Sequence, residues 1–210
     1  MNEEIALNNR EYELYTTECE AAMRMARTRI ENLLSLRKAK GEEIPCSIVY
    51  RTKTLDSTME KCARKGYECT IDSIKENVRD IAGIRIVTLF KSDIYTIAEL
   101  IEKAPGLNVV KIRDYIEEPK PNGYSSLHIH VQIEIYSDEG SKLVPVEIQI
   151  RTKAMDLWAE LEHHLYKNKG SFPDEFKGIF KQTANALAKF DSFGDQIKEK
   201  ISENEDATEQ

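Results

Sequence analysis

The sequence has little of the residues that most easily assign a chain to a specialised class. Its 210 residues include only 9 glycines, 6 prolines and 4 cysteines. Glycine and proline this scarce exclude a collagen-like or low-complexity linker protein. Hydrophobic residues make up 40% and charged residues 32%, so the composition is polar but still supports a packed core. No stretch approaches the roughly 20 apolar residues that cross a bilayer, and we therefore expect no membrane partner.

The cysteines carry no pattern of their own. They form no CxxC pair and do not have the spacing of a metal finger. The four residues are Cys19, Cys46, Cys62 and Cys69. We expect reduced thiols in a cytoplasmic protein. The first ten residues contain acids and no apolar core, which predicts no secretory signal.

Several catalytic motifs are also missing. The sequence has no GxxxxGK[ST], GxGxxG, HExxH, GxSxG or EF-hand pattern. None of the four histidines is followed by Asp, which disfavours a metal-dependent phosphohydrolase with a His-Asp dyad. A net charge of −7 disfavours a general nucleic-acid coat protein, so we expect no DNA partner. Phosphate ligands remain allowed where the local charge is positive.

Hydrophobic periodicity predicts an α+β fold, with a mixed β-sheet of about five strands flanked by helices. The predicted strands are Ile44–Tyr50, Ile81–Phe90, Leu107–Tyr115, Leu127–Ile135 and Val144–Ile150. The predicted helices are Glu3–Lys40, Thr54–Lys65, Ile71–Val78, Asp93–Lys103, Lys153–Lys167 and Asp174–Ile201. The apolar faces of the long terminal helices indicate self-association.

A cationic segment follows the first predicted strand. Arg51 and Lys53 are two residues apart, so they share one side of an extended segment. Ser57, Lys61 and Arg64 follow at helical spacing on one face. The segment is suited to a polyphosphate chain, although a basic surface helix would look the same.

Two carboxylates stand at predicted strands. Asp80 lies at the start of an apolar strand that also carries Arg85, an arrangement that suits a hard cation or, alternatively, a structural pair between the two side chains. Glu147 shares one face of the last strand with Gln149 and Arg151. Glu147 is a candidate metal ligand or base, and Gln149 and Arg151 are candidates for contact with phosphate or ribose. The alternative for this face is exposure to solvent.

A loop of unusual composition, KPNGYSSLH, runs from Lys120 to His128. Its Asn122-Gly123 pair presents Tyr124 at a loop tip, where an exposed aromatic ring can stack on a nucleobase. The alternative is a hairpin loop whose tyrosine packs on the body of the domain. On the helix that follows the last strand, we expect Trp158 in the core.

Five segments in order, RTKTLDSTMEK, DIAGIRI, KPNGYSSLH, VEIQIRT and MDLWAELEHHLY, resemble the synthetase domain of the RelA/SpoT alarmone family, in its small single-domain form. With this resemblance, the chain divides into an N-terminal helical extension for oligomerisation (1–43), the synthetase domain (44–168) and a C-terminal helix (169–201). The last residues, 202–210, are acidic and lack apolar anchors, so we expect a disordered acidic tail there.

The resemblance implies Mg²⁺-dependent transfer of the β,γ-pyrophosphoryl group of ATP to the 3′-hydroxyl of GDP or GTP, with release of AMP, in the stringent response. It implies that Asp80 and Glu147 serve catalysis and bind the metal. The implied ATP contacts are Arg51, Lys53, Ser57, Lys61, Arg64 and Arg85. The implied contacts of the guanine nucleotide are Tyr124, Lys120, Asn122, His128, Gln149 and Arg113.

The resemblance also implies a homotetramer. Arg24, Arg27 and Arg29 on the first helix are candidates to bind an alarmone or single-stranded RNA as a regulator. Two other functions stay open. One is a toxin-type enzyme that pyrophosphorylates the 3′ end of tRNA, and the other is a non-catalytic nucleotide- or RNA-binding regulator.

Overall fold

The computed structural model describes residues 2–138, 140–166 and 174–208. Its strands are β1 (Cys46–Thr52), β2 (Ala82–Thr88), β3 (Asn108–Asp114), β4 (Leu127–Ser137) and β5 (Gly140–Thr152). Its helices are α1 (Asn2–Ala39), α2 (Leu55–Lys65), α3 (Ile71–Asn77), α4 (Lys91–Lys103), α5 (Lys153–Tyr166) and α6 (Asp174–Thr208). The predicted α+β fold with a five-stranded mixed sheet is confirmed.

The sheet has the strand order β1-β2-β5-β4-β3, so the last strand in the sequence lies in the middle. β5 runs parallel to β2 and antiparallel to β4. This register pairs Glu147 with Gly83 and His130, and it pairs Gln149 with Arg85 and His128. Polar side chains from three strands therefore lie together on one face of the sheet.

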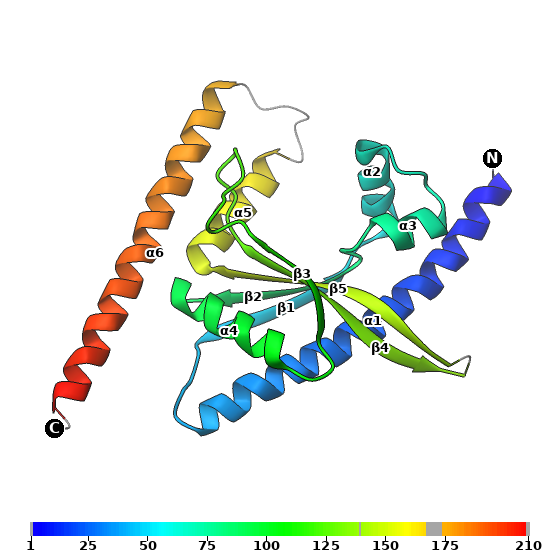
Figure 1. Cartoon of the computed structure of the whole chain (residues 1–210). Coiled ribbons are helices and arrows are strands. Elements are labelled where there is room, and N and C mark those ends of the chain that lie inside the picture. Colours follow the sequence, from blue (N-terminus) through cyan, green and yellow to red (C-terminus); the bar gives the residue numbers. More distant parts are fainter. Residues whose placement is uncertain (1, 139, 167–173, 209–210) are drawn as a thin grey trace.

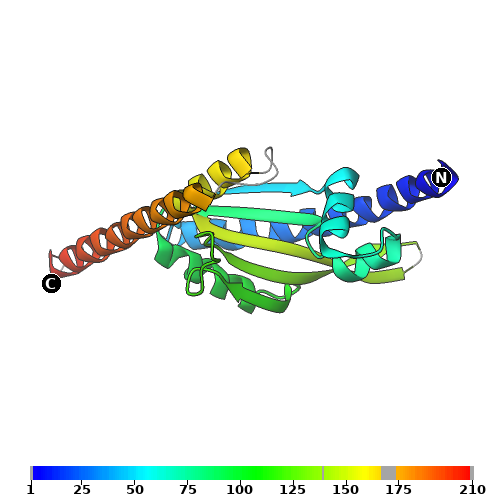
Figure 2. The ribbon, with the colours of Figure 1, turned by 90° about the horizontal axis from the view of Figure 1, so that it is seen from above.

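The opposite face of the sheet forms the core. Ile86, Ile129 and Ile148 on the three central strands are fully buried, as expected from the alternation of side chains along a strand. Helices α1 and α4 cover this face, while α2 and α5 lie on the other side (Figure 1). Figure 2 shows that the two long helices extend beyond the sheet at opposite ends.

Helix α2 ends where the sequence predicted and begins one residue later, after Thr54. The hydroxyl of Thr54 accepts a hydrogen bond from the backbone N–H of Ser57, and Gly66 ends the helix in the left-handed conformation with φ of 70°. These are common start and stop devices of helices. They set the two ends of α2, which follows directly after β1 and carries the cationic side chains.

The prediction of a disordered tail over residues 202–210 is wrong for residues 202–208, because α6 continues to Thr208. The segment contains neither glycine nor proline, and extending an existing helix by one residue costs far less than starting a new one. Residues 209–210 and the predicted boundary at 168/169 lie outside the described residues. None of the helices in the described part of the chain has an apolar stretch that would span a bilayer.

Candidate active site

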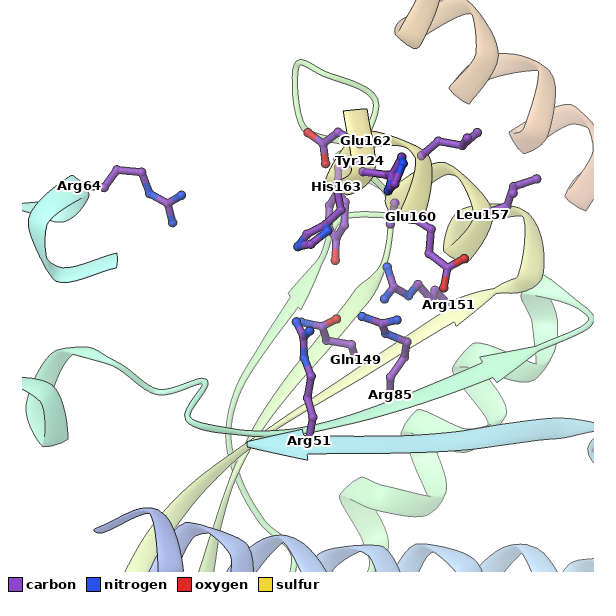
Figure 3. Close-up of a pocket in the computed structure, with 13 residues that line it drawn as sticks. Arg51, Arg64, Arg85, Tyr124, Gln149, Arg151, Leu157, Glu160, Glu162 and His163 are labelled. Atoms are coloured by element: carbon purple, nitrogen blue, oxygen red, sulfur yellow. The ribbon is translucent and has the colours of Figure 1, made fainter. Parts of the chain in front are cut away.

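Two adjoining cavities open on the polar face of the sheet. The larger has a volume of about 870 Å³ and the smaller about 320 Å³. Arg51, Arg85 and Gln149 line both cavities, so the cavities meet at these three side chains. Figure 3 shows them rising from neighbouring strands beneath α5. Cavities of this size are typical of small-ligand sites.

The smaller cavity contains Asp80 and part of the predicted cationic segment. Asp80 accepts hydrogen bonds from the ammonium groups of Lys53 at 2.8 Å and Lys61 at 2.6 Å, and Ser57 also lines this cavity. Burial opposes ionisation of Asp80, but the two lysines outweigh it and hold its pKa below the ordinary value. Asp80 therefore pairs with lysines, while Arg85 lies 3.4 Å from Asp156 instead.

Glu147 lies deeper, with 9% of its surface exposed. His128 Nδ1 is 3.0 Å from Glu147 Oε1, and the amide of Gln149 donates a hydrogen bond of 2.7 Å to Oε2. Burial raises the pKa of this carboxyl. The contacts with His128 and Gln149 lower the pKa by more than burial raises it, so the net pKa lies below the ordinary value. Glu147 is therefore a carboxylate held in place from both sides.

Tyr124 is half-buried, and the prediction of an exposed ring at a loop tip is wrong. Its hydroxyl is 2.8 Å from His128 Nε2, and its ring contacts those of Tyr115, His128 and Trp158 edge-on. Three neighbouring rings give the side chain more packing partners than a free loop tip would. Tyr124 nevertheless lines the larger cavity, so it combines packing on the domain with access to a ligand.

The remaining predicted contacts of the guanine nucleotide lie outside the residues that line the cavities. The Lys120 ammonium is 4.7 Å from the centres of the Tyr115 and Tyr124 rings, and Asn122 donates a hydrogen bond to Glu162. Arg113 is exposed on β3, beside His128 on β4. Their roles as ligand contacts stay predictions. Across the larger cavity, Arg64 approaches from α2 (Figure 3).

Arg151 lines the larger cavity, although it is not among the nucleotide contacts that the resemblance implied. Only 2% of it is exposed, and its Nε lies 2.9 Å from Asp156 on α5. Burial, reinforced by the nearby Arg85, lowers the pKa of Arg151. Alternation along β5 had placed Arg151 on the polar face, but Asp156 was missed because its position depends on how α5 docks. Trp158 is 3% exposed, so its predicted place in the core is confirmed.

Asp80 and Glu147 suit a hard divalent cation. Both line the smaller cavity, and both are kept ionised by their neighbours. No cluster of three or more possible metal-ligating side chains occurs among the described residues. Mg²⁺ sites commonly use one or two carboxylates together with substrate phosphates and water, so this donor set fits Mg²⁺ bound together with a nucleotide.

A family model described as a region found in RelA/SpoT proteins matches residues 50–171. The GTP pyrophosphokinase YjbM of Bacillus subtilis is 32% identical over 199 residues, which cover 94% of this chain and 93% of that protein. The GTP pyrophosphokinase YwaC of the same organism is 42% identical over 135 residues, which cover 64% of each protein.

Solved structures agree along nearly the whole chain. A GTP pyrophosphokinase family protein from Streptococcus pneumoniae superposes with a TM-score of 0.83 at 31% identity, covering 92% of this chain and 96% of that one. Small alarmone synthetase 1 from Bacillus subtilis, bound to its product pppGpp, gives a TM-score of 0.82 at 31% identity, covering 90% and 97%. The chain therefore belongs to the RelA/SpoT family, and within it to the small alarmone synthetases, which are GTP pyrophosphokinases.

Proposed function

We propose that the chain transfers the β,γ-pyrophosphoryl group of ATP to the 3′-hydroxyl of GDP or GTP. The oxygen of that hydroxyl loses its proton and attacks the β-phosphorus. The bond between the β-phosphorus and the oxygen that bridges it to the α-phosphorus breaks, and AMP leaves with that oxygen. The arrangement that carries the proposal is the pair of adjoining cavities, which share Arg51, Arg85 and Gln149 while Asp80 and Glu147 line the smaller one. Two nucleotides need two neighbouring sites, and their reacting groups must meet where the sites join.

For ATP, we assign the adenine to the space between Arg51 and Arg85, whose planar guanidinium groups stack on aromatic rings. Lys53, Lys61 and Ser57 then face the phosphates, with Arg64 approaching from the end of α2. Since Lys53 and Lys61 together neutralise only the one charge of Asp80, a positive charge remains for the phosphates. These cations stabilise negative charge that develops during transfer.

For the acceptor, we assign the guanine ring to Tyr124. Its hydroxyl contact with His128 fixes the orientation of the ring, and a pre-oriented ring loses less entropy when a base stacks on it. His128 and Gln149 flank Glu147, so they lie between the assigned guanine site and the carboxylates. Arg113, Lys120 and Asn122 remain assigned to the rim of this site.

Asp80 and Glu147 would hold Mg²⁺, which neutralises phosphate charge when it is bound. Glu147 had two open roles, base or metal ligand. The contacts with His128 and Gln149 hold the Glu147 carboxylate in place, and a carboxylate can bind the metal or accept the proton of the hydroxyl group. We assign it the ligand role because it lines the same cavity as Asp80.

The test is a chromatographic product assay. Purified protein is incubated with Mg²⁺ and ATP, together with GMP, GDP, GTP or deacylated tRNA in separate reactions. The proposal predicts AMP and a 3′-pyrophosphorylated guanine nucleotide in equal amounts. Modified tRNA without free alarmone would contradict the proposal in favour of the toxin-type enzyme, and no transfer to any acceptor would contradict it in favour of a non-catalytic regulator.

We propose that the enzyme acts as a homotetramer in the cytoplasm. Support for assembly comes from apolar side chains on α6 that are more than half exposed, namely Phe190, Phe193, Ile197 and Ile201. None of the four cysteines, all of which lie in the described part of the chain, forms a disulfide, in keeping with a reducing compartment.

A regulatory anion site on α1 has less support. Arg27 pairs with Glu31 at 2.7 Å and lies over the ring of Tyr50. Arg29 donates a hydrogen bond to the carbonyl of Gly106. Arg24, the third candidate, lies 3.9 Å from Glu20, and 64% of its side chain is exposed. Arg27 and Arg29 are engaged within the chain, so binding an alarmone or single-stranded RNA there would have to compete with their contacts.

A further inference from the structure

The hydroxyl of Tyr12 on α1 is buried where the N-terminal helix meets the assigned ATP site. It lies 2.8 Å from the backbone carbonyl of Lys53 and 2.8 Å from the hydroxyl of Thr58. Tyr12 is 5% exposed and Thr58 is fully buried. The contacts join residues 41 and 46 positions apart in the sequence, so they depend on the tertiary fold.

The direction of these hydrogen bonds follows from the chemistry of the partners. A carbonyl only accepts, so the single proton of Tyr12 must go to Lys53. Thr58 then donates its own proton either to Tyr12 or to the carbonyl of Thr54, which is 3.0 Å away. Burial raises the pKa of Tyr12, so the phenol keeps its proton at neutral pH.

The carbonyl that Tyr12 holds belongs to the short connection between β1 and α2. Its residue, Lys53, donates its backbone N–H to Ile81, next to Asp80. Thr58 is one helical turn before Lys61. The hydroxyl therefore contacts the backbone of one lysine and the helix that carries the other, and both ammonium groups converge on Asp80.

We propose that Tyr12 is a positioning residue for the ATP phosphates, which fixes Lys53 and Lys61 relative to Asp80 from the N-terminal helix. The inference rests on the proposed function, because it needs ATP in the smaller cavity. Tyr12 itself lines neither cavity. It acts through the lysines and touches no reacting atom.

The test compares Tyr12→Phe with wild type, since this change removes one oxygen and keeps the buried ring. The first measurement is calorimetric binding of AMPCPP with Mg²⁺ and without acceptor. We expect binding to weaken about three- to tenfold, the range for one buried hydrogen bond. In the transfer assay, KM for ATP should rise by a similar factor, and KM for GDP should stay within about twofold.

The matched control is Tyr15→Phe. Tyr15 lies one turn further along α1 and is also 5% exposed, but its ring packs near Lys75 of α3. This variant should bind AMPCPP like wild type. Thermal unfolding of both variants, followed by circular dichroism, reveals any general loss of stability.

Each outcome has one reading. Equal AMPCPP affinity in Tyr12→Phe and wild type overturns the proposal, and so does a rise in KM for GDP as large as that for ATP. Wild-type protein that binds no AMPCPP overturns the proposed function instead. If Tyr12→Phe does not fold, Thr58→Val replaces it with Thr58→Ser as control. A two- to threefold loss of affinity in the valine variant alone supports the proposal, and wild-type affinity in both overturns it.

Discussion

Asp80 is the point on which two lysine side chains converge. We expect Asp80→Asn to lower the rate of AMP release at least about 100-fold, because the variant loses the anionic oxygen that suits the metal. The fold should survive, since the three side chains are each 22–23% exposed and part-exposed ion pairs contribute little to stability. Product chromatography and circular dichroism measure the two effects. Asp56→Asn, the same change on the exposed side of α2, should act like wild type. Turnover retained in Asp80→Asn would remove Asp80 from the reaction.

Glu147 makes stability depend on pH. Its pKa is lowered in the folded chain, so its contribution to stability is complete above the ordinary value of about 4.3 and is lost as the pH falls through the lower folded value. The melting temperature of wild type should therefore fall more steeply below about pH 5 than that of Glu147→Gln. Melting curves from pH 7 to pH 3 provide the test. Glu118→Gln, at an exposed position, should keep the wild-type slope, and parallel curves for Glu147→Gln and wild type would contradict the assignment.

Most of the site follows from alternation along strands. Glu147, Gln149 and Arg151 were predicted on one face of β5, and all three line a cavity. The surroundings of Tyr124 could not be predicted in this way. Its burial depends on Trp158 and His128, which come from separate elements whose docking no local pattern specifies.

At the level of elements, α6 supports the loop that carries Tyr124. Gly123 has φ of +94°, and a Cβ placed there would lie 2.6 Å from the Cβ of Ala184 on α6. Trp158 adds to this contact by donating a hydrogen bond to the carbonyl of Phe180. The loop and α6 are therefore packed with no room for one more methyl group.

We expect Gly123→Ala to raise KM for GDP about tenfold, because the loop must move away from α6 and the new residue is strained at positive φ. KM for ATP should change less than twofold. Adding Ala184→Gly removes the collision but not the strain, so the double variant should recover part of the acceptor affinity. Steady-state kinetics with each substrate varied in turn measure this. Equal KM values for GDP in Gly123→Ala and wild type would show that the loop is not held by α6.

The elements themselves were largely predictable, and their arrangement was not. All five predicted strands and all six predicted helices occur with shifted ends, because hydrophobic period and Gly or Pro breaks are local signals. The place of β5 between β2 and β4 depends on side chains far apart in the sequence. The prediction ended α6 too early, at Ile201, because the following residues are not apolar. A helix needs no apolar residues to continue, and α6 runs to Thr208.

At the scale of the whole molecule, the outer face of α6 predicts assembly. Phe193 is 61% exposed and Ile197 is 60% exposed, one turn apart. We expect wild type to have the mass of four chains by light scattering, and Phe193→Glu/Ile197→Glu to have a smaller mass, because burying two carboxylates in an apolar contact is costly. Tyr136→Glu, at an exposed position on β4, should keep the wild-type mass. A monomeric wild type would contradict the proposed tetramer.

The central position of β5 in the sheet has a consequence for folding during synthesis on the ribosome. Until residues 140–152 have left the exit tunnel, no strand lies between β2 and β4. Glu147, the carboxylate that lines the smaller cavity together with Asp80, is then also missing. Pairing of Gly83 with Glu147 closes a long loop, which is a slow step in folding. A nascent chain that stops before β5 therefore cannot assemble the nucleotide sites, because Glu147 and Gln149 of β5 line them.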